Sequence, residues 1–326
     1  MDISILGPGA VGMLLGGLFK LKGHGVVLKG RRSPSGQGAG AVSTLRIVLP
    51  RGWLLVEGVE QTGPEEAAPT DAVLVTLGRH HLHALRRPDF SRLTGGGECP
   101  VALFNCDPAE IERLAVAPEM LRLCLTLMNA VKLQENDVEL VTERPIILYE
   151  RAPHLDRLFR DLAAFGFQAV AVPDARPHLN SLLVWQLLFL PVAMCNTTLG
   201  IFLSFPEGRE LAAGLIAEGC AAMEKAGFPM ASLPSLDPRE LAARLNKKPG
   251  SFETGTELPD RGCNSLLQSY LKGKPTEAAR LNRRIVEIAS AAGMHLTWNW
   301  RIVQKMSRVS GLGFYRTPAE LLRSLA

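Results

Sequence analysis

The chain has 326 residues, of which 47% are hydrophobic and 21% are charged, and its formal net charge is +4 at pH 7. This length allows two domains with sizeable cores, and the balanced composition excludes a disordered or low-complexity chain. The basic residues form scattered pairs, such as Arg31-Arg32 and Lys247-Lys248, and not one continuous stripe. We therefore expect no nucleic-acid partner, whereas one such pair suits a small anionic ligand.

The cysteines argue against a metal site and against a disulfide framework. There are six of them, without a C-x-x-C pair or a clustered histidine, and most lie in apolar stretches. The chain runs from Met1 directly into a strand pattern, without the basic and apolar regions of a signal peptide. These features predict a cytoplasmic protein with no bound metal.

The N-terminal half alternates short apolar runs with helical patterns. Residues 2–6 predict a strand, residues 10–22 a helix ending at Gly23-His24-Gly25, and residues 26–28 a second strand. The further predicted strands are 45–49, 53–59, 71–77, 100–104, 121–128, 138–141, 146–150 and 168–172, with a helix over 155–165. This alternation predicts an α/β fold with a doubly wound sheet over residues 1–174.

After residue 174 the pattern becomes helical. The predicted helices are 180–203, 206–227, 238–245, 264–271, 276–293 and 298–310. Residues 182–203 are apolar and long enough to span a bilayer, but Gln186, Pro191 and the polar residues 196–198 interrupt them. We favour a buried helix, and therefore no membrane, within an all-α domain over residues 175–326. This domain is expected to bind substrate and to be the place for a homodimer interface, if one forms.

A glycine motif lies between the first strand and the first helix. It reads Gly7-Pro8-Gly9-Ala10-Val11-Gly12, the G-x-G-x-x-G pattern. The first glycine permits a tight turn, the second admits a pyrophosphate, and the third allows close helix–strand packing. The helix amides and dipole would then face the phosphates. The motif predicts a Rossmann-type dinucleotide site, the alternative being a plain strand–helix turn.

The end of the second strand indicates which dinucleotide. Enzymes that use NAD place an acidic residue there, whereas this chain reads Lys29-Gly30-Arg31-Arg32. Arg31 can grip a 2′-phosphate with two hydrogen bonds, so NADP(H) is the favoured cofactor. The alternative is that both arginines lie on a solvated loop.

Several spaced stretches together resemble the ketopantoate reductase (2-dehydropantoate 2-reductase) family. They are residues 5–12, 23–24 with Arg31, 75–77, 104–105, Trp185, 264–268, 275–277, 292–293 and Asn299. The resemblance implies a Rossmann domain, a helical domain and an active site between them. It also implies that NADPH gives a hydride to the ketone of a 2-keto acid while a lysine donates a proton.

The resemblance further implies roles for individual residues. Asn105, Glu277 and Asn196 would be catalytic, and Ser265 with Asn196 would bind the small-molecule substrate. The cofactor would be held by Gly7, Gly9, Ala10, Val11, Gly12, Arg31, Leu77, Asn105 and Glu277. Asn105 has separate support, because it ends a predicted parallel strand where ligands of open α/β sheets collect. Ser265 and Glu277 also fit ordinary helix-start positions.

The family's polar helix face is missing. Its lysine falls at Leu187, and its two following asparagines fall at Pro191 and Cys195. A register shifted by one recovers Asn196 but places Leu188 and Val192 in the other two positions. Loss of a general acid costs roughly 10²–10⁴-fold in rate. Arg79, His80, His81 and His83 form a cluster that offers a substitute acid or a solvated loop.

Two functions therefore stay open. One is an NADPH-dependent reductase of ketopantoate or another 2-keto acid, which uses a substitute acid or a changed substrate. The other is a catalytically impaired NADP(H)-binding protein of the same fold, in which the apolar positions 187, 191 and 195 line a hydrophobic pocket. A third, weaker hypothesis is an NADP dehydrogenase for a bulkier apolar substrate.

Overall fold

The structure is a computed structural model. It describes residues 1–30, 41–64, 66, 70–77, 99–106, 118–234, 237–245, 277–308 and 315–325. The chain divides into two compact units, Met1–Ala175 and Arg176–Ala326. Each unit is described below by itself.

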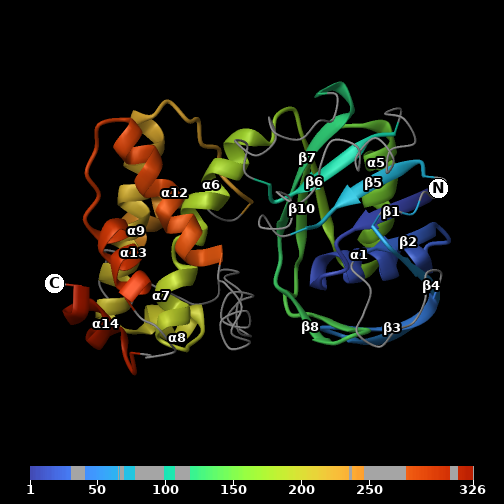
Figure 1. The fold of residues 1–326 in the computed structure, drawn as a ribbon, viewed down its shortest axis with the longest axis horizontal. Helices are drawn as coiled ribbons and strands as arrows, with labels where there is room; N and C mark the ends of the chain where they lie inside the picture. Colours follow the sequence, from blue (N-terminus) through green and yellow to red (C-terminus); the bar gives the residue numbers. More distant parts are fainter. Residues whose placement is uncertain are drawn as a thin grey trace. The chain divides into compact units, whose positions relative to one another are not determined.

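The first unit is built on one mixed sheet (Figure 1). Its described strands are β1 (Asp2–Leu6), β2 (Gly25–Lys29), β3 (Ala41–Leu49), β4 (Gly52–Thr62), β5 (Ala72–Val75), β6 (Val101–Phe104), β7 (Leu121–Leu127), β8 (Ala130–Gln134), β9 (Asp137–Leu140), β10 (Ile146–Glu150) and β11 (Gln168–Val172). Its described helices are α1 (Ala10–Leu21), α5 (Pro153–Asp161) and the short 3₁₀ segments η1 (Pro118–Met120) and η2 (Leu162–Phe165). The sheet order is β11-β10-β7-β6-β5-β1-β2-β4-β3-β9-β8.

The centre of this sheet confirms the predicted fold class. Strands β4, β2, β1, β5, β6 and β7 are neighbours in that order and run parallel. Taken by their position in the chain, they follow the order 3-2-1-4-5-6 of the doubly wound dinucleotide-binding sheet. The strand order reverses between β1 and β5, which is where open α/β sheets bind their ligands.

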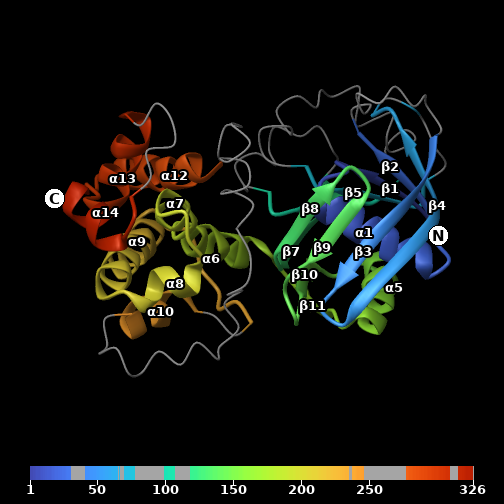
Figure 2. The ribbon, with the colours of Figure 1, turned by 90° about the horizontal axis from the view of Figure 1, so that it is seen from below.

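The outer strands curve around α1. Strand β3 pairs antiparallel with β4 and parallel with β9, which forms a hairpin with β8. Helix α1 contacts β1 and β2 as well as β3, β4, β8 and β9. Figure 2 shows β3, β8 and β9 crossing in front of this helix. Both sides of α1 are therefore covered, which explains why its residues from Gly12 to Phe19 are all buried.

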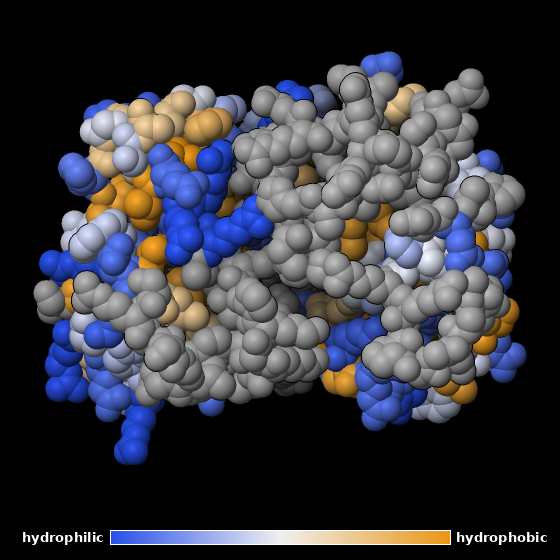
Figure 3. Space-filling model, viewed as in Figure 1, coloured by the Kyte–Doolittle hydropathy of each residue, from blue (hydrophilic) through white to orange (hydrophobic). Residues whose placement is uncertain are grey.

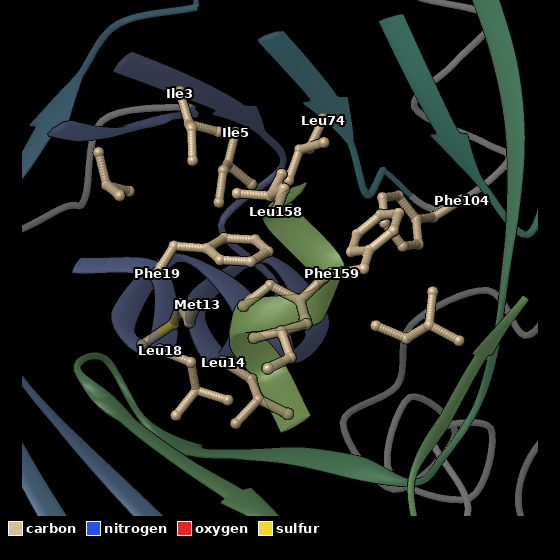
Figure 4. Packing of buried hydrophobic residues seen from close by; sticks show 14 of the residues in the cluster. Ile3, Ile5, Met13, Leu14, Leu18, Phe19, Leu74, Phe104, Leu158 and Phe159 are labelled. Carbon is tan, nitrogen blue, oxygen red and sulfur yellow. The ribbon is translucent and has the colours of Figure 1, made fainter. Parts of the chain in front are cut away.

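The core of the first unit lies between the parallel strands, α1 and α5 (Figure 4). Ile3 and Ile5 of β1 point toward Phe19 of α1, and all three side chains are at most 1% exposed. On α5, Phe159 packs edge-to-face against Phe104, with ring centroids 6.1 Å apart. Burial of such aromatic and aliphatic side chains stabilises the domain by roughly 1.5–3 kcal/mol each. The strands whose carboxyl ends carry the loops are therefore packed against a filled core.

The second unit is helical in its described residues. The helices are α6 (Arg176–Gln186), α7 (Phe189–Met194), α8 (Leu199–Ser204), α9 (Pro206–Lys225), α10 (Pro238–Leu245), α12 (Glu277–Ala291), α13 (Trp298–Arg308) and α14 (Pro318–Leu325). Helix α9 contacts α6, α8, α10, α12, α13 and α14, so it forms the centre of the unit. Hydrophilic side chains lie along the outer face of α12 in Figure 3. The opposite face of α12 buries Leu281, Ile285 and Ile288.

The prediction of one continuous helix over residues 180–203 is wrong. The amides of Leu187 and Leu188 bond to carbonyls only three residues back, on Val184 and Trp185, so α6 tightens and ends at Gln186. Pro191 then has no N–H to donate to Leu187 O, one helical turn earlier. Asn196, at φ 46°, ends α7 in the left-handed conformation.

The apolar segment at the start of the second unit is mostly buried. By length and composition, Arg176–Met194 could cross a bilayer. However, 78% of its most apolar stretch is buried inside the structure. The core helix of a folded unit accounts for this pattern, as the sequence interpretation favours.

The described elements β8, α14 and the short η1 escaped prediction, and one predicted element cannot be compared. Strand β8 follows β7 after a short turn, and no strand is predicted from the sequence between residues 128 and 138. Helix α14 begins at Pro318, where Thr317 Oγ1 accepts a hydrogen bond from Glu320 N at 3.2 Å. This Thr-Pro-x-Glu pattern is a helix-start signal that could have been used. The predicted helix 264–271 lies outside the described residues.

Candidate functional site

The carboxyl ends of the parallel strands bring several predicted site residues to one edge of the sheet. Strands β1, β2, β5, β6 and β7 are mutually parallel, so the segments that follow them meet at this edge. These segments carry Gly7–Gly12, Lys29-Gly30, Thr76-Leu77 and Asn105. This is the edge at which doubly wound sheets bind nucleotides.

The glycine loop starts with a turn that a side chain would not allow. Gly7 has φ 102°, its amide donates to Lys29 O at 2.9 Å, and its carbonyl accepts from Gly9 N at 2.8 Å. A Cβ on Gly7 would lie 3.0 Å from the amide nitrogen of Leu77. Both backbone conformation and the close approach of β5 therefore require glycine.

Gly12 is required by close packing between α1 and the strands. A Cβ at this position would lie 2.2 Å from Gly7 O and 2.6 Å from Thr76 Oγ1. Thr76 in turn donates its hydroxyl proton to Gly7 O at 2.8 Å. The sequence interpretation gave Gly12 this packing role, but it did not assign one to the Thr76 hydroxyl, which holds the loop on the end of β5.

Gly9 differs from the other two glycines. Its φ is −77°, a value that any residue can adopt, and a Cβ there would meet nothing within 4 Å. Nothing in the described protein therefore requires glycine at this exposed position. A ligand bound against the loop would require glycine at this position, because a side chain would fill the space in which a pyrophosphate would lie.

The N-terminus of α1 faces the same space. The first helical hydrogen bond runs from Met13 N to Gly9 O at 2.9 Å. The amides of Ala10, Val11 and Gly12 precede this bond, and the first turn contains no acidic residue. Amides at a helix start, with the positive end of the helix dipole, favour a phosphate.

The side chain of Lys29, at the end of β2, already binds another group of the protein. Its side chain is fully buried, and its ammonium donates to Glu66 O at 2.5 Å. Burial lowers the pKa of Lys29, while the charges of Glu66 and Glu60 oppose that shift. Lys29 is thus a structural residue, which leaves Arg31 as the proposed 2′-phosphate ligand; Arg31 lies outside the described residues.

Asn105 is locked onto the neighbouring strand. It has φ 52°, its Nδ2 donates to Thr126 Oγ1 at 2.8 Å, and its Oδ1 accepts from Thr126 N at 2.9 Å. Two hydrogen bonds to the buried Thr126 fix the amide at the end of β6. The geometry puts Asn105 at the ligand-binding edge, and Thr126 is a positioning residue that sequence reasoning missed.

The helix positions that replace the family's polar face are buried within the second unit. Leu187 and Leu188 are both 0% exposed, and Val192 is 1% exposed. A Cβ on Gly219 of α9 would lie 2.7 Å from Leu187 Cδ1, so this leucine packs into the helical core. The interpretation that these positions line an apolar pocket therefore needs correction, since Leu187 fills the space between α6 and α9.

Of the remaining three positions, Pro191 and Cys195 are buried and Asn196 lies on the surface. Cys195 is 6% exposed, and burial, followed by the charge of Glu320, raises the pKa of its thiol to about 12. It is therefore a neutral thiol at neutral pH. Asn196 is exposed, with its amide donating to Ala193 O at 3.0 Å. A left-handed residue at a helix end favours asparagine, which accounts for its presence without a ligand.

A buried polar cluster supports the break between α6 and α7. Asn282 Nδ2 donates to Asn299 Oδ1 at 2.9 Å and to Leu187 O at 3.5 Å. Asn299 Nδ2 donates to Leu215 O, and Glu218 accepts hydrogen bonds from the amides of residues 297–299 at the start of α13. Asn282 thus serves the carbonyl that Pro191 leaves without a helical donor. In the sequence, the polar Asn282 stands on the otherwise apolar face of α12, and this position could have indicated a buried hydrogen-bonding role.

Several predicted site residues cannot be placed. Arg31, Ser265, Arg79 and the histidines at 80, 81 and 83 lie outside the described residues. Glu277 is the first residue of α12, but its side chain is not described. Within the described ranges, no group of three or more His, Cys, Asp or Glu side chains could hold a metal ion.

Comparisons with known proteins give a family match for part of this chain and solved structures of similar fold. Residues 182–310 match the family model for the C-terminal domain of ketopantoate reductase PanE/ApbA. A search of curated proteins finds no match.

Three solved structures illustrate the likeness in fold. Dimeric ketopantoate reductase from Staphylococcus aureus has a TM-score of 0.70 and 18% identity, covering 94% of this chain and 98% of its own. The PanE/ApbA family ketopantoate reductase from Ralstonia eutropha JMP134 has a TM-score of 0.71 and 18% identity, covering 94% and 97%. D-mandelate dehydrogenase with NADH and anilino(oxo)acetate has a TM-score of 0.72 and 14% identity, covering 100% and 99%. Such identities establish the fold and leave the substrate open.

Proposed function

The chain resembles the ketopantoate reductase family in its fold and, over residues 182–310, in its sequence, and on that premise we propose that it is an NADPH-dependent reductase of a 2-keto acid. The observation that carries the proposal is the glycine loop at the switch point of the sheet. Gly7 and Gly12 are required by the protein's own packing, whereas Gly9 leaves open space beside the start of α1. This division is what a pyrophosphate site needs.

The residues of the first unit support binding and orientation. Bound NADPH would supply the hydride. The amides of Ala10, Val11 and Gly12 would hold the pyrophosphate, and Arg31 would distinguish NADP from NAD. Asn105, fixed by Thr126, would present its amide at the edge of the sheet. Ser265, Glu277 and Asn196 keep their proposed roles toward substrate and catalysis by resemblance alone.

The proton must come from another source than the helix lysine of the family. Leu187 and Leu188 occupy the two candidate positions, and both are buried. The cluster of Arg79 with the histidines at 80, 81 and 83 follows β5 in the sequence, and one of these histidines is proposed as the alternative acid. Under this proposal, reduction is slower than in an enzyme with a positioned lysine, by about 10²-fold or more.

A second function rests on the same buried helix. If no residue replaces the lysine, the chain is an NADP(H)-binding protein with impaired catalysis. The observation that favours it is that a leucine stands at the family's lysine position in either register, Leu187 or Leu188. Both leucines are completely buried.

An assay of NADPH oxidation with ketopantoate and a panel of other 2-keto acids separates the two functions. Oxidation that requires one keto acid and yields the matching 2-hydroxy acid supports the reductase. Tight binding of NADPH without oxidation by any member of the panel supports the binding protein. Absence of NADPH binding contradicts both. Mixtures without keto acid give the background rate.

The proposal extends to assembly and location. The structure from Staphylococcus aureus is described as a dimeric ketopantoate reductase, and a homodimer is accordingly proposed for this chain. Sedimentation velocity at two concentrations tests it. A cytoplasmic location is part of the same proposal, and the burial of 78% of the most apolar stretch of Arg176–Met194 supports it.

A further inference from the structure

The residue that follows β2 packs directly on the proline of the glycine loop. A Cβ on Gly30 would lie 2.4 Å from both Cδ and Cγ of Pro8, but 3.8 Å from Pro8 Cβ. The φ of Gly30 lies outside the left-handed region, so the backbone conformation does not require glycine at this position. The two outer carbons of the proline ring are therefore what excludes a side chain at position 30.

Hydrogen bonds hold both partners of this contact in place. Gly30 N donates to Thr62 O at 3.2 Å, and Gly7 N donates to Lys29 O at 2.9 Å. The second bond joins the residue before Pro8 to the residue before Gly30. The proline ring cannot rotate its Cγ and Cδ away, because it is closed onto the backbone nitrogen. A side chain at position 30 would thus have to separate the glycine loop from β2.

Position 30 is also the place from which NAD enzymes bind the ribose. Their acidic residue follows the second strand, about 20 residues after the glycine motif, and Gly30 meets both conditions. The side chain of the preceding Lys29 is buried, and its ammonium binds Glu66 O instead. A Cβ at position 30, by contrast, would point at Pro8 of the loop.

We propose that Pro8 and Gly30 together form a specificity determinant for the adenosine end of the dinucleotide. The proline ring occupies the space that an acidic side chain at position 30 needs, so no carboxylate reaches the ribose from this position. A carboxylate there would also repel a 2′-phosphate, and its exclusion suits NADP(H). This inference rests on the proposed function, since it assumes that a dinucleotide occupies the glycine loop.

The test is a double-mutant cycle, in which the full-length protein is titrated with NADPH and with NADH and binding is followed by cofactor fluorescence. Gly30→Asp alone weakens the binding of both cofactors by a similar factor, about tenfold, because the loop is displaced. Pro8→Ala removes Cγ and Cδ and keeps Cβ, which lies at an ordinary contact distance from a side chain at position 30. In that background, Gly30→Asp shifts the ratio of the two affinities toward NADH by about a hundredfold.

The matched control combines Pro8→Ala with Gly30→Asn, which has the size of the aspartate but no charge, and its shift toward NADH is smaller. Thermal unfolding without ligand compares the stability of all variants, and Pro8→Ala must raise the unfolding temperature of Gly30→Asp. Without that rise the inference is wrong. A shift toward NADH of the same size with and without Pro8, or a wild type that binds NADH as tightly as NADPH, overturns it as well. Absence of binding of either cofactor by the wild type overturns the proposed function instead.

Discussion

The glycine loop after β1 and the helix pair α6–α7 differ in what their residues serve. In the loop, Gly7 and Gly12 are required by close contacts with Leu77 and Thr76, which follow β5, while no described residue requires glycine at position 9. In the helix pair, Leu187, Leu188 and Val192 are all buried in the helical unit. One region therefore keeps space for a ligand, and the other fills with side chains the positions where the family has polar groups.

The difference indicates which part of the proposed chemistry the structure supports better. The loop depends on backbone amides and on the absence of side chains, and both persist while the sequence around them changes. The helix face depends on three particular side chains, so three substitutions remove it. Cofactor binding is thus the better supported half of the function.

A charge at Leu187 should be the most damaging change. Leu187→Lys places an ammonium at a fully buried position that packs against Gly219 of α9, and we expect the free energy of unfolding to fall by about 4 kcal/mol. Leu187→Met, which keeps the side chain apolar, should cost only about 1 kcal/mol. Urea denaturation measures both. A stable lysine variant with a gain in 2-keto acid reduction would show that this position faces substrate.

A methyl group at Gly12 should destabilise the first unit. Gly12→Ala puts a Cβ 2.2 Å from Gly7 O, so α1 must move away from the loop, at a cost of about 3 kcal/mol. Gly9→Ala is the matched control, because its Cβ meets nothing within 4 Å, and its stability should stay within about 0.5 kcal/mol of the wild type. Equal stability of the two variants in urea would contradict the packing role of Gly12.

The polar cluster beside the helix break should show coupling with Pro191. Asn282→Ala leaves Leu187 O and Asn299 without their donor and should cost about 2 kcal/mol. In a Pro191→Ala background the new amide can donate to Leu187 O, so the same change should cost about 0.5–1 kcal/mol less. A double-mutant cycle in urea measures this difference. Strict additivity would mean that Asn282 does not substitute for the missing helical donor.

Burial of Cys195 should make stability sensitive to alkali. The folded state holds the pKa of this thiol at about 12, above its ordinary value of 9.0. Between these values the folded protein binds more protons than the unfolded chain, so stability falls as pH rises above 9. Cys195→Ala should reduce that fall by about 1 kcal/mol between pH 9 and pH 10. Parallel pH profiles of the two proteins would sink the idea of a buried thiol.

The elements with local signals could be predicted from the sequence. The strand–glycine–helix unit at residues 2–22 and the short apolar strands needed only periodicity and turn residues. The hairpin of β3 and β4 was placed correctly but is longer, since its outer residues continue the pairing to Ala41 and Gln61. These features are determined by neighbours in the sequence.

The features that tertiary contacts determine could not be predicted. The donor that serves Leu187 O at the break is Asn282, which is distant in sequence, and the hydrogen bonds that fix Asn105 come from Thr126 on another strand. The curvature that brings Lys132 to Pro8 depends on the whole sheet order. The burial of Leu187 likewise depends on Gly219 of another helix, so a sequence pattern alone suggested a pocket where the core is filled.

The central claim is that Gly9 is kept for a dinucleotide and not for the fold. The most direct measurement is a titration of wild type and Gly9→Ala with NADPH, together with thermal unfolding of both proteins without ligand. The account predicts unchanged unfolding temperatures and an NADPH affinity at least about tenfold lower in the variant, because the added methyl group occupies phosphate space. Equal affinities in two equally stable proteins would contradict it.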